Sequence, residues 1–213
     1  MCHFTFGKFK DKSINDVFKE DPKYIYWVIK QKWFKQKFAK EYKMCMCLLD
    51  IDKQYPPIQE DDIIIYTDGA CSNNGSTSAK AGIGVHFSKR NKISFNDISE
   101  PFPGSVKDKP TNQRAELKAI LEALRVVKEL SNRIIIYTDS EYSINCITRW
   151  FSSWVKQNKL DEKKNIDLIQ PIHLYYRHLR LEFRHINSHT GLQDEHSLGN
   201  EEADRLATAS LVK

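Results

Sequence analysis

The sequence lacks a run of about 18 uninterrupted apolar residues, which is the length that a helix needs to cross a bilayer. Residues 1–10 also lack the apolar stretch of a secretory signal. We therefore expect neither a membrane span nor an export signal. Cysteine is scarce and odd in number, with five in the chain, so we expect reduced thiols in an intracellular protein, cytoplasmic or nuclear, rather than a disulfide framework.

Arginine is absent from residues 1–43, although this segment is strongly basic. Eleven lysines there face five acidic residues, a local balance of +6, whereas the rest of the 213-residue chain has a balance of −1. This asymmetry predicts a basic module attached to a neutral body, and it suits a polyanionic partner. The alternative is a solvated lysine surface that only aids solubility.

Length and composition fit one full domain with a smaller module beside it. We place a small, basic and mainly helical N-terminal module at residues 1–49, a linker at 50–62 and a larger domain at 63–213. In the module, Ser13 is expected to cap a short helix and Asp21-Pro22 to open the next one. We interpret the aromatic residues between the lysines as the core of this module, with base stacking as the alternative.

The larger domain begins with three predicted strands joined by turns and then alternates strands with helices. The predicted strands are Ile63–Tyr66, Ala81–Phe87, Lys92–Ile98, Ile134–Tyr137 and Leu181–His185, and the predicted helices are residues 111–130, about 165–180 and 199–210. An antiparallel start followed by this alternation predicts an α/β fold, in which helices flank a mixed sheet.

Two of these strands end in nearly the same sequence, YTDG at 66–69 and YTDS at 137–140. If the strands are parallel neighbours, Asp68 and Asp139 face each other where open α/β sheets place their sites. Glu116 and Asp204 lie on predicted helices. Each acid taken singly also fits turn chemistry, capping or a solvated helix surface. Four carboxylates together would repel one another and require hard cations such as Mg²⁺ or Mn²⁺, which in pairs support phosphoryl displacement.

Residues from about 61 to 210 resemble type 1 ribonuclease H. The matching segments occur in the family's order and are YTDGACSNNG (66–75), AGIGVHF (81–87), TNQRAEL (111–117), YTDSEYSINCITRW (137–150) and GNEEADRLA (199–207). The resemblance implies a five-stranded mixed sheet, a two-metal site and endonucleolytic cleavage of the RNA strand of RNA–DNA hybrids, which leaves 5′-phosphate and 3′-hydroxyl ends. The implied partner is an RNA–DNA hybrid, and we expect a monomer.

Carried over by position, the resemblance implies catalytic roles for five residues. The metal ligands for two Mg²⁺ ions, with Mn²⁺ as a substitute, are Asp68, Glu116, Asp139 and Asp204. His189, in SHTG at 188–191, matches a histidine that assists proton transfer. The loop after it is longer than usual and adds a second histidine, His196. Which histidine enters the site therefore stays open. By default, His185 and His196 are assigned structural or surface roles.

The same resemblance implies three groups of substrate contacts. Asn74, Asn112 and Gln113 match residues that read the 2′-hydroxyls of the RNA strand, Tyr142, Trp150 and Trp154 match an aromatic channel for the deoxyribose, and Lys109, Thr111 and Asn165 match a phosphate pocket for the DNA strand. Residues 155–164 stand in the place of a basic protrusion but carry Asp161 and Glu162. A weaker grip on nucleic acid is therefore expected there.

The N-terminal segment 7–28 resembles a small module appended to some nucleases. We expect residues 1–43 to add an electrostatic contact to nucleic acid, with a protein-partner surface as the rival interpretation. The larger domain has two alternative interpretations. Another nuclease or integrase of the wider superfamily is disfavoured by the intact TNQRAE and SINCITRW segments, and an inactive hybrid-binding protein is disfavoured by the intact acids.

Overall fold

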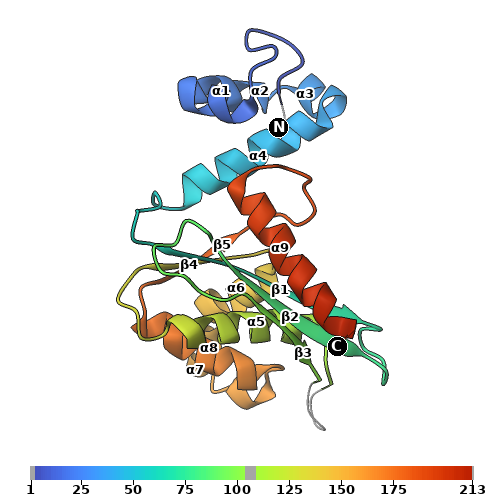
Figure 1. Cartoon of the computed structure of the whole chain (residues 1–213), viewed down its shortest axis with the longest axis vertical. Coiled ribbons are helices and arrows are strands. Elements are labelled where there is room, and N and C mark those ends of the chain that lie inside the picture. Colours follow the sequence, from blue (N-terminus) through green and yellow to red (C-terminus); the bar gives the residue numbers. More distant parts are fainter. Residues whose placement is uncertain (1–2, 104–108, 213) are drawn as a thin grey trace. The chain divides into compact units, whose positions relative to one another are not determined.

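The computed structural model describes residues 3–103 and 109–212 (Figure 1). The chain forms two compact units, one of Met1–Ile58 with His189–Leu198 and the other of Gln59–Ser188 with Gly199–Lys213. We call them the N-terminal unit and the sheet unit and describe each by itself. No helix in the described ranges is long and apolar enough to cross a membrane.

In the N-terminal unit, the described residues of its first segment form α1 (Ile14–Glu20), α2 (Pro22–Val28), α3 (Lys32–Lys37) and α4 (Ala39–Gln54). The side chain of Ser13 caps α1 by accepting the Asp16 N–H, and Asp21 caps α2, which begins with Pro22, as predicted. The core is largely aromatic and aliphatic, and its fully buried members include Phe4, Ile14, Ile25 and Phe34. Leu192, from the unit's second segment, packs into this same core.

The segment expected to be a linker, 50–62, is partly helical, because α4 continues to Gln54. The helix ends where Tyr55 adopts an extended backbone, with φ −131° and ψ 143°. Tyr55 precedes Pro56, and the proline ring disfavours helical geometry in the residue before it. The helix therefore stops at the proline rather than at the change in composition, and the domain limits drawn from the sequence stay a prediction.

The sheet unit contains five strands, β1 (Ile63–Ser72), β2 (Lys80–Phe87), β3 (Ile98–Phe102), β4 (Ile134–Thr138) and β5 (Leu181–His185). Their order across the sheet is β3-β2-β1-β4-β5. The pairs β1–β2 and β2–β3 are antiparallel, whereas β1–β4 and β4–β5 are parallel. This confirms the predicted five-stranded mixed sheet.

The predicted third strand is misplaced, since Lys92–Ile98 is mostly irregular and β3 begins at Ile98. In the described residues 92–97, the backbone does not pair with the sheet. Side chains in and just before this segment form hydrogen bonds to the sheet instead. The Asn91 amide donates to the Ile64 carbonyl and accepts the Ile64 N–H, both at 2.9 Å, and Asp97 accepts the Phe87 N–H at 2.9 Å. These contacts satisfy backbone groups that a longer strand would otherwise pair.

Helices cover both faces of the sheet. They are α5 (Asn112–Val127), α6 (Glu141–Asn145), a π-helical segment (Cys146–Trp150), α7 (Phe151–Lys156), α8 (Ile166–His178) and α9 (Glu195–Ala209), with short 3₁₀ turns at Leu160–Glu162 and Ser210–Val212. Ile63 and Ile65 of β1 join a core with Leu117 and Ile120 of α5. On the other face the α9 backbone approaches so closely that a β-carbon on Gly84 would lie 2.0 Å from the Ala203 carbonyl oxygen. Figure 1 shows α9 crossing the strands on this side.

Candidate active site

The parallel pairing of β1 with β4 brings two aspartates to neighbouring positions. Tyr66 of β1 lies opposite Tyr137 of β4, and each is followed two residues later by an aspartate, Asp68 or Asp139. Asp68 is buried within β1, whereas Asp139 directly follows β4 and is half-buried. The predicted neighbouring parallel arrangement of these two strands is confirmed.

A third carboxylate comes from the first turns of α5. Thr111 caps this helix by accepting the Arg114 N–H at 3.3 Å, and Glu116 follows within it, buried. One carboxylate oxygen from each of Asp68, Glu116 and Asp139 lies within 4.8 Å of the other two. Three of the four predicted acids are thus brought together by three separate elements.

Two of the three carboxylates, those of Asp68 and Glu116, have strongly raised pKa values. Burial, followed by the charge of Asp139, raises the pKa of Asp68 to about 7, although the Gly69 N–H that Asp68 accepts at 2.8 Å acts in the opposite direction. Burial and the charges of Asp68 and Asp139 likewise raise the pKa of Glu116 well above its ordinary value. Bringing these groups together without a cation therefore costs free energy at neutral pH.

The cluster also has the chemistry of a cation site. The Oε2 atom of Glu116 is buried and has no hydrogen-bond partner among the residues that the structure describes. An acceptor without a donor in this position is a destabilising arrangement unless a cation or a proton occupies it. An all-oxygen set of carboxylates fits a hard divalent cation.

The fourth predicted acid and the histidines are placed differently. Asp204 lies on α9, half-buried, and its charge contributes to the raised pKa of Asp68, but it is not part of the close cluster. His189 is exposed, has a left-handed backbone with φ 50°, and belongs to the N-terminal unit. The backbone N–H of His196 donates to Asp194 at 3.1 Å. The roles of Asp204 and His189 stay predictions.

His185, given a structural role by default, ends β5 beside the acids. Its Nε2 atom lies 3.2 Å from the backbone carbonyl oxygen of Asp139. This contact can hold the segment that carries the Asp139 carboxylate. The sequence gives no local signal for it, because it depends on the pairing of β4 with β5.

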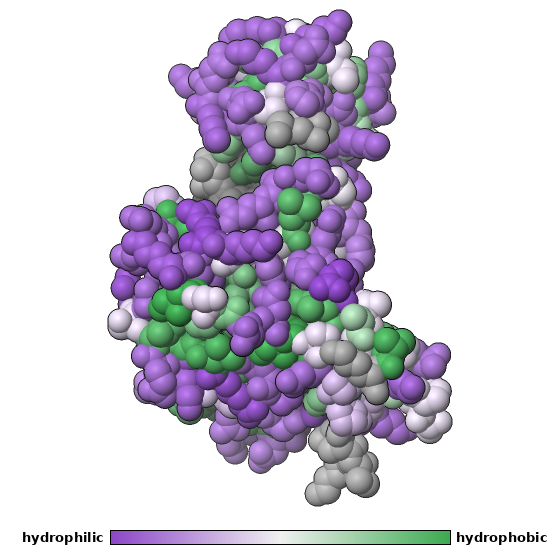
Figure 2. Space-filling view, in the orientation of Figure 1, coloured by the Kyte–Doolittle hydropathy of each residue, from purple (hydrophilic) through white to green (hydrophobic). Residues whose placement is uncertain are grey.

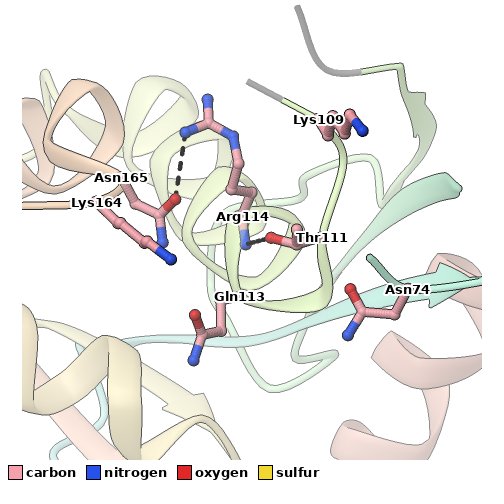
Figure 3. Close-up of a pocket in the computed structure, with 7 residues that line it drawn as sticks. All are labelled: Asn74, Lys109, Thr111, Gln113, Arg114, Lys164 and Asn165. Carbon is pink, nitrogen blue, oxygen red and sulfur yellow. Dashed lines mark hydrogen bonds between the residues drawn. The ribbon is translucent and has the colours of Figure 1, made fainter. Parts of the chain in front are cut away.

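Five of the predicted substrate residues line one open pocket of about 610 Å³ at the start of α5 (Figure 3). Its lining consists of Asn74, Lys109, Thr111, Gln113, Arg114, Lys164 and Asn165. Figure 3 shows these side chains arriving from the β1–β2 turn, from the start of α5 and from the segment before α8. Asn112 is exposed beside it, and its backbone N–H donates to the side-chain amide oxygen of Asn74 at 3.3 Å. Three cationic side chains and no acid line this pocket, which suits an anion.

Arg114 is a site residue that the sequence reasoning missed. It is buried, and its guanidinium donates to both carboxylate oxygens of Asp167 at 2.9 and 2.6 Å and to the Asn165 amide oxygen at 3.3 Å. The hydrogen bonds from Arg114 lower the pKa of Asp167. The Asn165 amide in turn donates to the Tyr142 hydroxyl at 3.0 Å. Arg114 thus joins the start of α5 to the start of α8 and orients Asn165.

The three predicted aromatic residues lie along one surface. The ring centroids of Tyr142 and Trp150 are 6.2 Å apart, as are those of Trp150 and Trp154. Trp150 is 41% exposed and ends the π-helical segment, a local widening that often occurs at functional sites. The Lys163 ammonium lies 5.7 Å from the Trp154 ring centroid. The arrangement is an aromatic surface beside the pocket, since Asn165 contacts Tyr142.

Models of two known families match separate parts of the chain. A model of the RNase H family matches residues 60–211, and a model described as Exodeoxyribonuclease X-like C-terminal matches residues 4–32. Among known proteins, Ribonuclease H1 of Homo sapiens is 33% identical over 165 residues, which cover 71% of this chain and 53% of the human protein. Ribonuclease H of Orientia tsutsugamushi is 36% identical over 156 residues, 70% of this chain and 82% of that protein. The chain thus spans about half the length of the human relative.

Solved structures agree on the fold. The solution structure of the PFV RNase H domain superimposes with a TM-score of 0.57 at 24% identity, covering 70% of this chain and 94% of that domain.

Proposed function

The chain belongs to the ribonuclease H family, and from that premise we propose that it cleaves the RNA strand of RNA–DNA hybrids endonucleolytically. The observation that carries the proposal is the convergence of Asp68, Glu116 and Asp139, within 4.8 Å of one another, beside a cationic pocket. An inactive hybrid-binding protein would have no use for a costly cluster of buried acids.

We propose that Asp68, Glu116, Asp139 and Asp204 hold two Mg²⁺ ions, with Mn²⁺ as a substitute. Such ions, when bound, make water a better nucleophile and stabilise the leaving 3′ oxygen, which yields 5′-phosphate and 3′-hydroxyl ends. The contribution of the chain is to fix the carboxylates in place, so that a bound cation would favour their ionised form. Burial of Asp68 and Glu116 supports this role, because the surrounding structure holds their side chains.

Two surfaces distinguish the strands of the hybrid in this proposal. Asn74, Asn112 and Gln113 can both donate to and accept from a 2′-hydroxyl, which DNA lacks. For the DNA strand, the cations of the pocket at the start of α5 hold a phosphate, together with Thr111 and Asn165. Trp150 and Trp154 pack against the deoxyribose beyond it. The face of an aromatic ring offers no hydrogen bond to a ribose 2′-hydroxyl, so this surface favours the DNA strand.

We assign His189 to proton transfer at the scissile phosphate. An imidazole titrates near neutrality and can both accept and release a proton there. The exposure of His189 leaves it accessible to substrate.

A cleavage assay with three labelled substrates tests the proposal: an RNA–DNA hybrid, duplex RNA and duplex DNA, each with Mg²⁺ and with a chelator. We expect Mg²⁺-dependent cleavage of the RNA strand in the hybrid alone. Cleavage of duplex DNA would favour another nuclease of the superfamily, and tight hybrid binding without cleavage would favour an inactive binding protein.

A further inference from the structure

Trp27 stands apart from the other aromatic residues of the N-terminal unit. Among the large apolar side chains described in residues 3–46 it alone is exposed, at 51%, whereas Phe4, Phe9 and Phe34 are buried. The visible face of this unit is mostly hydrophilic in Figure 2. Most aromatic residues therefore form the core, as the sequence indicated, but Trp27 does not, and its ring needs another explanation.

The Trp27 ring is held from beneath by the core. Its centroid lies 5.5 Å from that of Tyr24, one helical turn earlier, and Tyr24 packs edge-on against Phe9 at 4.8 Å. The turn at Gly7, with φ +71°, closes on the Tyr24 hydroxyl, since a β-carbon there would lie 2.7 Å from that oxygen. Trp27 is therefore a supported platform. Because the ring is already held in place, stacking of a ligand on it costs little conformational entropy.

Three exposed lysines lie near Trp27 in the sequence or contact the rings that support it. Lys23 and Lys30 lie within one turn of Trp27 along the chain, both are exposed, and neither has an ion-pair partner among the residues that the structure describes. Lys8, beside Phe9 at 4.6 Å from its ring centroid, forms an exposed ion pair with Asp21 at 3.3 Å. Exposed pairs of this kind contribute little stability, so Lys8 can exchange Asp21 for a phosphate.

We propose that Trp27, with Lys23, Lys30 and Lys8, forms a binding site for single-stranded nucleic acid. An exposed ring can stack on an unpaired base, whereas bases within a duplex already cover both faces of one another. Lysines act on the backbone phosphates as point charges and carry no preference for sequence. The site deepens the nucleic-acid contact expected of residues 1–43, and it does not depend on cleavage by the sheet unit.

Binding of a labelled oligothymidylate to the full chain, followed by fluorescence anisotropy, tests this site. We expect Trp27→Ala to weaken binding roughly 5- to 100-fold, the range found for loss of one stacking partner, and Trp27→Tyr to restore most of it. Lys23→Gln with Lys30→Gln should flatten the dependence of log affinity on log salt. Val126→Ala, which truncates another exposed apolar side chain (46% exposed), is the matched control and should bind as the unmodified chain does.

A second titration compares a blunt hybrid with one that carries a single-stranded overhang. The overhang should increase affinity in the unmodified chain and not in Trp27→Ala. Unchanged oligothymidylate binding by a folded Trp27→Ala variant would overturn the inference and favour a protein-partner surface. Equal losses on blunt and overhanging hybrids would also overturn it. If the unmodified chain bound oligothymidylate through Trp27 and yet cut no hybrid, that result would support this site and refute the proposed nuclease activity instead.

Discussion

The backbone of Gly69 in β1 lies directly against that of Glu116 in α5: a β-carbon at position 69 would be 2.2 Å from the Glu116 nitrogen and 2.4 Å from the Ala115 carbonyl carbon. These are backbone atoms, which cannot rotate away as a side chain can. The absence of a side chain at Gly69 therefore allows the carboxylates of Asp68 and Glu116 to share one site.

Gly69→Ala should push α5 away from β1. We expect it to lower the free energy of unfolding by about 1–3 kcal/mol, the usual cost of overpacking, and to weaken Mg²⁺ binding because Glu116 moves with the helix. Thermal unfolding and calorimetric Mg²⁺ titration measure the two effects. Gly75→Ala is the control, because Gly75 has a positive φ but open space around it. This substitution should lower stability only through the strain of a left-handed backbone and should leave Mg²⁺ affinity unchanged. Equal Mg²⁺ affinity in both variants would show that the close contact does not position Glu116.

Asp139→Asn should abolish cleavage in Mg²⁺ while leaving hybrid binding largely intact. The amide keeps the shape of the carboxylate but removes its charge, so the ligand is lost and the surface is not. Cleavage rates and hybrid dissociation constants, measured on the same preparation, separate the two effects. Near-normal turnover in this variant would refute the metal site.

Metal-free protein should become less stable as the pH rises from about 4 to about 7. The pKa of Asp68 is about 7 in the fold against an ordinary value of 3.8, so between these values the folded chain holds a proton that the unfolded chain has released. Stability then falls by at most about 1.4 kcal/mol per pH unit for this one proton.

Chemical denaturation in the presence of a chelator, repeated across this pH range, measures this slope, which is the change in the free energy of unfolding with pH. Asp68→Asn should flatten it, whereas Asp161→Asn, at an exposed position, should not. Mg²⁺ should stabilise the unmodified chain more at pH 8 than at pH 5, because it binds the ionised carboxylates. If Asp68→Asn left this slope unchanged, the pH dependence of stability would come from other groups.

His189→Ala should slow turnover roughly 10- to 10⁴-fold, the scale of lost proton-transfer assistance, without abolishing metal binding. His196→Ala, in the same loop, is the matched comparison. Single-turnover rates on a short hybrid measure both. A larger loss in His196→Ala would move the catalytic role to that residue.

Deletion of residues 1–50 should leave a nuclease, because the carboxylate cluster and the cationic pocket lie in the sheet unit. Loss of the +6 segment should weaken hybrid binding at low salt and flatten the salt dependence of affinity, since fewer counterions are released. Hybrid titrations at several salt concentrations compare the two chains. Identical slopes would mean that the segment does not contact phosphates.

The β-branched runs and the repeated Tyr-Thr-Asp sequences were sufficient to predict the central strands and two of the acids, because both signals are local. The irregular segment before β3 was missed because Asn91 and Asp97 bond to distant backbone groups. Arg114 was missed for a similar reason, since its partner Asp167 lies 53 residues away and gives no pattern at short range.

Leu192 links the lengthened loop to the N-terminal module. It is 8% exposed because the N-terminal unit covers it, so the lengthened loop that bears His189 shares a core with residues at the opposite end of the sequence. Removal of the module would uncover this leucine, three residues after His189 in the same loop. The N-terminal module therefore also serves to cover an apolar side chain of this loop.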